Sequence, residues 1–135
     1  MKRKPMSFGD FIKHKRLERE KIQGEVAKAL DLSISYYSEV ERGVKLPFTP
    51  DKIEMFAKYL RLTKEEKAQM YDLASCENNE IPADIANTFL YTDFGDVMRF
   101  AFREFQAGNL EEDDVKQLIR KAEENKNRNK GDTGE

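Results

Sequence analysis

Residues 23–43, which decide the fold, read QGEVAKALDLSISYYSEVERG. Apolar residues at helical spacing predict a short helix over residues 23–30. A turn follows at residues 31–33, where Ser33 can cap a second helix that runs to about residue 42. Two short helices joined by such a turn form a helix-turn-helix motif.

One side of each helix in this motif is expected to be buried. A small side chain at Ala27 lets the two helices cross closely, Leu32 fills the space between them, and Val40 anchors the second helix to the core. The outer face of the second helix is then polar apart from Ile34. Short polar side chains near a helix N-terminus suit close approach to base edges in a DNA major groove.

The order of residues around the motif resembles the XRE family, the Cro and phage-repressor type of helix-turn-helix regulators. The resemblance covers residues 8–75 and rests on Arg16, Gln23, residues 25–27, 32–38 and 40–43, Pro50, Ala57 and Leu60. Gly24 departs from the family, which usually has a helix-forming residue there. A glycine at that position costs up to about 1 kcal/mol of helix stability.

The resemblance implies a role for each matching residue. Base-reading positions of the family correspond to Ile34, Ser35, Ser38 and Glu39. Contacts to the DNA backbone are implied for Gln23, Ser33, Tyr36, Arg42 and Lys45. Arg16 and Glu41 match a pair that forms a buried ion pair in several members, so their implied role is structural.

The net charge of −2 hides an uneven distribution along the chain. Residues 1–50 contain eleven Lys and Arg against seven Asp and Glu, whereas residues 76–135 contain eight against fourteen. The first part is suited to phosphates and the second to protein contacts. The basic residues 2–4 are either a solvated end or an arm that reaches a groove.

The pattern along the chain predicts an all-α protein. A five-helix, repressor-type helix-turn-helix domain is expected over residues 7–75, followed by a small helical unit over residues 83–125 that dimerises or binds a partner. Residues 1–6 are expected to be a flexible basic N-terminus, and residues 76–82 a polar linker. Residues 126–135 contain no apolar side chain and are expected to be a disordered tail.

The C-terminal unit contains a helix around residue 100, which Asp93 can cap. One side of it carries Phe94, Val97, Met98, Ala101 and Phe105, with Phe102 at the margin. Phe100 falls roughly opposite. Either both sides pack within one compact fold, or Phe100 and Phe102 belong to a partner surface, most simply for a second copy of the chain. We favour the partner surface.

Several classes of protein are not expected. One cysteine, Cys76, and one histidine, His14, argue against a disulfide or a metal site and favour a cytoplasmic protein. Neither a membrane-spanning segment nor a secretory signal is predicted. With no phosphate-binding loop and no nucleophile–base pair, the sequence predicts neither an enzyme nor a cofactor. The acidic residues 111–114 are explained by the dipole of the helix that they begin.

These observations predict a bacterial or phage-encoded transcriptional regulator. It is expected to bind a palindromic operator in double-stranded DNA as a homodimer, through the helix at residues 33–42, and to repress. The alternative is an antitoxin, whose C-terminal unit binds a toxin while the same motif represses its own operon.

Overall fold

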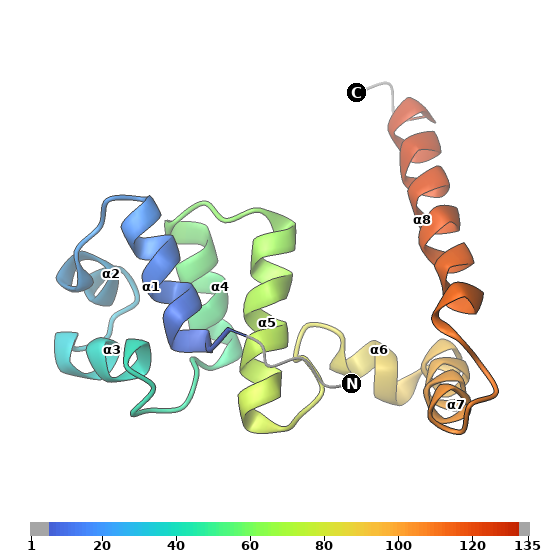
Figure 1. Ribbon diagram of the computed structural model, residues 1–135. Coiled ribbons are helices and arrows are strands. Elements are labelled where there is room, and N and C mark those ends of the chain that lie inside the picture. Colours follow the sequence, from blue (N-terminus) through green and yellow to red (C-terminus); the bar gives the residue numbers. More distant parts are fainter. Residues whose placement is uncertain (1–5, 133–135) are drawn as a thin grey trace. The chain divides into compact units, whose positions relative to one another are not determined.

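The computed structural model describes residues 6–132 and is all-helical over that range (Figure 1). Its helices are α1 (Phe8–Glu18), α2 (Gln23–Ala29), α3 (Ile34–Glu41), α4 (Pro50–Tyr59), α5 (Lys64–Asn78), α6 (Ala86–Tyr91), α7 (Asp93–Gln106) and α8 (Glu112–Asp132). The chain divides into one compact unit that ends at Asn87 and another that begins at Thr88. The predicted all-α class is confirmed.

Local side-chain caps explain where three of the helices begin. The hydroxyls of Ser7 and Ser33 accept hydrogen bonds from backbone N–H groups three residues further on, at 3.0 and 3.1 Å. Thr63 and Glu66 form a reciprocal capping box at the start of α5. Each cap satisfies N–H groups that have no partner within the helix, and the cap at Ser33 was expected from the sequence.

The core of the first unit lies between α1, α2, α3, α4 and α5. Phe48, in the loop after α3, has its ring centroid 5.4 Å from Phe8, 6.0 Å from Tyr37 and 6.0 Å from Phe56. One loop residue thereby joins α1, α3 and α4. Sequence periodicity did not reveal it, because Phe48 belongs to no helix.

Gly9 allows α1 to approach α3 closely. A Cβ atom built at Gly9 would collide with the backbone carbonyl of Glu41 and lie 2.8 Å from the carbonyl oxygen of Val40. The sequence had assigned a close helix crossing to Ala27, which is fully buried. The crossing at Gly9 was missed.

Polar contacts attach α1 to α4 and α5. Lys15 Nζ lies 2.7 Å from a carboxylate oxygen of Glu66, and Arg19 Nε donates to the carbonyl oxygen of Leu60 at 3.0 Å. The hydrogen bond from Lys15 is the largest of the effects that lower the pKa of Glu66 to about 2. These bonds fix the position of α1, on which the helix-turn-helix depends.

Two segment boundaries differ from the sequence-based prediction. Helix α5 continues to Asn78, so the first three residues of the predicted linker 76–82 are helical. Helix α8 continues to Asp132, so the disordered tail predicted from residue 126 is wrong as far as that residue. Absence of apolar residues prevents core burial, but Lys126, Arg128 and Lys130 are good helix formers that extend a helix already begun at Glu112. Residues 1–5 and 133–135 lie outside the described residues.

The start of α7 also differs from the prediction. Thr92, and not Asp93, is the N-cap, and its hydroxyl accepts a hydrogen bond from the backbone N–H of Gly95 at 2.9 Å. Asp93 is instead the first residue of the helix, where a negative charge is favoured by the helix dipole.

Replacing Gly9 with alanine is expected to destabilise the protein by about 2 kcal/mol or more, because the backbones of α1 and α3 must move apart. Chemical denaturation followed by circular dichroism measures this change. Gly24→Ala is the matched control, since its Cβ would make an ordinary contact 3.5 Å from Ile34 Cδ1. The control should gain about 0.5–1 kcal/mol. Equal effects of the two substitutions would contradict the steric explanation.

Candidate nucleic-acid interface

The helix-turn-helix is formed by α2, the turn after it, and α3. Ala27, Tyr37 and Val40 are buried between these helices and the core. The N–H of Leu32 donates to the carbonyl oxygen of Ala27 at 2.8 Å and closes the turn. Gly43 has a φ of +77°, a conformation that favours glycine, and it ends α3. One face of α3 is therefore fixed to the core.

The opposite face of α3 carries the four residues for which base reading was predicted. Ile34 and Ser35 are exposed, while Ser38 and Glu39 are half-buried. Residues three and four positions apart share a helix side, so Ser38 neighbours both Ile34 and Ser35, and Glu39 neighbours Ser35. The structure therefore brings all four onto one face. The side chain of Ile34 also lies over Gly24 of α2.

A buried ion pair connects α1 to α3. Arg16 donates from Nε to one carboxylate oxygen of Glu41 at 2.7 Å and from Nη2 to the other at 3.1 Å. The amide of Gln23 donates to the same carboxylate at 3.0 Å. One carboxylate therefore joins the first three helices. The second N–H of the Gln23 amide stays available for a further acceptor.

The surroundings of Glu41 affect its protonation. Burial by itself raises the pKa of this carboxyl, but hydrogen bonds, first among them that from Arg16, outweigh burial and lower the pKa below its ordinary value. Burial, and then the nearby Glu41 carboxylate, raise the pKa of Tyr37. Among the described residues, the buried hydroxyl of Tyr37 has no hydrogen-bond partner. The lowered pKa of Glu41 means that the Arg16–Glu41 pair is charged at neutral pH.

The residues predicted to contact the DNA backbone lie around the exposed face of α3. Ser33 caps the helix, Tyr36 is 37% exposed in its first turn, and Arg42 is exposed at its end. Lys45 returns towards the helix, with its Nζ 3.9 Å from a carboxylate oxygen of Glu39. A cation therefore stands beside the one acidic side chain predicted to read bases.

A surface hollow joins this region to α1. Its lining is Ser7, Asp10, Lys13, Arg16, Gln23, Ser38, Glu41, Arg42 and Gly43. Lys13 was not singled out from the sequence, although its position three residues before Arg16 places both on the same side of α1. It adds an exposed cation beside Gln23 and Arg42.

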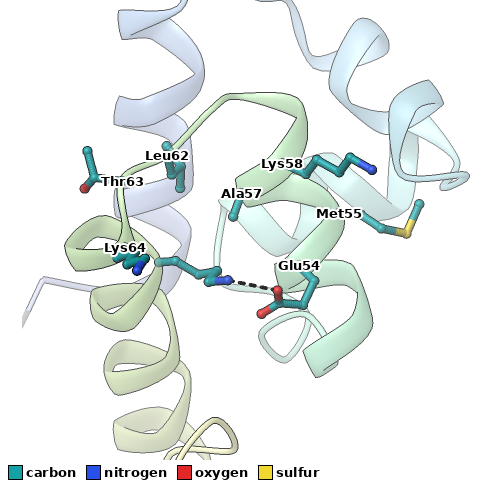
Figure 2. A pocket seen from close by; sticks show the side chains of 8 residues that line it. Glu54, Met55, Ala57, Lys58, Leu62, Thr63 and Lys64 are labelled. Atoms are coloured by element: carbon teal, nitrogen blue, oxygen red, sulfur yellow. Dashed lines mark hydrogen bonds and ion pairs between the residues drawn. The ribbon is translucent and has the colours of Figure 1, made fainter. Parts of the chain in front are cut away.

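A second hollow lies between α4 and α5 and contains none of the predicted site residues (Figure 2). Figure 2 shows the apolar side chains of Ala57 and Leu62 with Lys58 and Lys64 at its edge. Glu54 accepts a hydrogen bond from Lys67 at 3.0 Å, so the negative charge of Glu54 is already paired. This hollow is separate from the exposed face of α3.

The predicted partner-surface residues lie in the other unit. Phe100 is 64% exposed, and Phe102 is 55% exposed. The ring of Phe102 packs against Phe89 of α6, with 5.6 Å between centroids. The two residues therefore have different surroundings, since Phe102 makes a ring contact within the described residues and Phe100 makes none.

A tightly crossed helix pair with a buried inner face and a polar, exposed second helix defines a helix-turn-helix domain, a class that binds DNA. Residues 7–70 match the family model of a helix-turn-helix domain, which is consistent with an XRE-type regulator. Comparison with curated proteins and with solved structures found no match. None of the described helices is both long and apolar enough to span a membrane.

Replacing Glu41 with glutamine is expected to lower the free energy of unfolding at pH 7 by on the order of 3 kcal/mol, because Arg16 loses its charged partner while buried. The folded pKa of Glu41 lies below the ordinary value of 4.5. Wild type therefore keeps this stabilisation above about pH 4.5 and loses it as the pH falls through the lower folded pKa.

Denaturant unfolding of both proteins between pH 7 and pH 2 checks this expectation. The difference between them should shrink at low pH. Glu18→Gln is a suitable control, because the Glu18 side chain is 51% exposed and its ion pairs are worth little. A difference that is the same at every pH would show that the charge of Glu41 does not stabilise the fold.

Proposed function

We propose that this protein is a sequence-specific, double-stranded DNA-binding transcriptional regulator. It acts in the cytoplasm as a repressor and binds a palindromic operator as a homodimer. The observation that carries the proposal is the single polar face of α3, which is exposed while the opposite face is fixed by the core and by the Arg16–Glu41 pair.

The residues on that face suit base edges in the major groove. Glu39 can accept a hydrogen bond from a cytosine amino group, and Ile34 can contact a thymine methyl group. Ser35 and Ser38 can donate to or accept from either kind of base edge. Lys45, 3.9 Å from Glu39, lowers the repulsion between this carboxylate and the DNA phosphates.

Phosphate contacts surround the base-reading face. Five polar or charged groups can position the domain on the DNA backbone without reading sequence. They are the free N–H of Gln23, the hydroxyls of Ser33 and Tyr36, and the cations of Arg42 and Lys45. Lys13, which lines the same hollow as Gln23 and Arg42, extends this set onto α1.

Dimerisation is supported by the exposed aromatic residues of the second unit. One helix-turn-helix covers only a few base pairs, so two copies are needed for a site of useful length. Phe94, Phe100 and Phe105 of α7 are each at least 48% exposed. They lie on two sides of α7, and large apolar side chains that are exposed in this way are typical of a surface that another protein covers. Repression follows most simply, because occupying an operator requires no further contact.

Replacing Ser35 and Glu39 together with alanine is expected to change which sequences are bound while leaving the fold intact, because neither side chain belongs to the core. Relative affinities for operator variants should change about ten-fold or more, since one good base contact is worth ~1–3 kcal/mol. Selection from a random DNA pool, followed by fluorescence anisotropy on the selected sites, measures the change.

Arg42→Ala is the control for this experiment. Loss of a phosphate contact should weaken binding to every sequence alike and reduce its salt dependence. An unchanged ranking of operators in the Ser35 and Glu39 double variant would refute the base-reading assignment. Transcription that rises when the protein occupies its site would overturn the repressor part of the proposal.

Replacing Phe100 with glutamate is expected to dissociate the dimer, because a charge would be placed in a surface that must lose water. Sedimentation velocity gives the oligomeric state, and circular dichroism shows whether the helices persist. Leu17→Glu, at a residue of α1 that is 53% exposed, is the matched control and should leave the dimer unchanged. A dimer that persists in Phe100→Glu would reject this surface.

The alternative function, that of an antitoxin, rests on the same exposed aromatic residues. It differs in that a toxin, and not a second copy of the chain, covers them. It predicts a second protein of defined identity bound to wild type and lost in Phe100→Glu. Purification from native cells that recovers wild type alone would count against it.

A further inference from the structure

The second unit has almost no core of its own. Among the described residues from Thr88 onward, Gly95 is the only one that is buried. A Cβ atom there would collide with the backbone carbonyls of Thr88 and Phe89, so the burial reflects a close backbone approach and not an apolar core. Helices α6, α7 and α8 expose apolar side chains and bury none of them from Thr88 onward, so packing against another surface is needed to stabilise them.

Helix α8 carries its apolar residues in one short stripe. Val115, Leu118 and Ile119 are 37%, 55% and 60% exposed. With Ala122 and Asn125, residues 115, 118, 122 and 125 follow the alternating three- and four-residue spacing of a coiled-coil seam. No described helix packs extensively against α8, since the packed helix pairs all lie within the first unit.

The charges of α8 are segregated along its length. Residues 111–114 are four consecutive acids, whereas residues 126–130 contain Lys126, Arg128 and Lys130 and no acid. The helix dipole accounts for acids in the first turn, but its influence ends within about one turn. The dipole therefore does not account for Lys126, which lies more than one turn before the end of the helix at Asp132.

We propose that α8 pairs with α8 of a second copy of this chain in antiparallel orientation. This inference rests on the homodimer proposed above. It adds a second contact between the copies, beside the surface around Phe100, and gives the direction in which the two α8 helices run. A parallel arrangement would place the acids beside acids and the bases beside bases. The antiparallel arrangement places each acidic start beside the basic end of the other copy.

The seam positions fix the register of this pair. Residues 115 and 122 are a positions of the heptad, and residues 118 and 125 are d positions. In an antiparallel pair each a position faces a d position of the other helix. Leu118 therefore lies opposite Ala122 of the second copy, and Val115 lies opposite its Asn125. Two-fold symmetry repeats both layers. The middle of the pair falls at residue 120, and Ile119 meets its own counterpart beside the seam.

The same register brings opposite charges together on both sides of the seam. Glu112 then faces Lys126 of the second copy, and Asp114 faces its Arg128. Symmetry makes four such pairs. Within one chain Arg128 donates to Asn125 at 2.9 Å, a contact that it would exchange for the carboxylate. Lys121 faces Lys121 of the second copy, and this like-charge contact opposes the pairing. The four opposite-charge pairs outnumber it.

Disulfide cross-linking tests the direction of pairing in the full chain, after Cys76→Ser removes its exposed thiol. A mixture of Val115→Cys and Asn125→Cys chains should form a disulfide-linked dimer, whereas Val115→Cys alone should not. A parallel pair would give the reverse, because residue 115 would then face itself. Cross-linking of Val115→Cys to itself, or no cross-link in the mixture, overturns the proposal.

A charge exchange tests the register. Glu112→Lys with Asp114→Lys should weaken dimerisation about ten-fold in sedimentation equilibrium, because four exposed pairs become repulsive. Adding Lys126→Glu and Arg128→Glu should restore it. Asp113→Lys is the matched control, since residue 113 lies away from the seam, and it should leave the dimer unchanged. Failure of the second exchange to restore dimerisation refutes the register.

These outcomes separate the two proposals. A monomeric wild type would reject the proposed homodimer together with this pairing. A dimer that lacks the 115–125 cross-link would reject the pairing alone, and the surface around Phe100 would then account for the dimer.

Discussion

The helix-turn-helix depends on the hydrogen bonds and the ion pair made by the buried carboxylate of Glu41. Glu41 binds the guanidinium of Arg16 from α1 and the amide of Gln23 from α2, while its own backbone carbonyl packs against Gly9. Because a buried charge is costly unless it is paired, an arrangement of these three helices that separated the carboxylate from Arg16 would be unfavourable. The orientation of the exposed face of α3 follows from this pairing.

The two units of the chain use apolar residues in opposite ways. In the first unit they fill a shared core, in which Phe48 joins three helices, and the polar face of α3 remains outside. In the second unit they stay exposed on α7 and α8. The first unit therefore has a core of its own, whereas the apolar side chains of α7 and α8 remain exposed within a single chain. The charge difference between the two parts of the sequence agrees with this division.

Sequence reasoning succeeded where short-range chemistry decides the structure. Ser33 begins α3 as predicted, because its cap involves residues three positions apart. It failed for the tail, where missing apolar residues were taken as missing structure. Helix formation depends on backbone propensity and charge as well as on burial, so α8 extends to Asp132.

The sequence by itself determined the all-α class, the helix-turn-helix motif, and the set of residues on the outer face of α3, since all three depend on helical spacing and turns. Only the tertiary structure decided that Gly9 sets the approach of α1 to α3, that Phe48 completes the core, and that Lys13 lies beside Gln23. These contacts join residues from different helices or from a loop. Their partners are fixed by the packing of the whole unit, which no local pattern encodes.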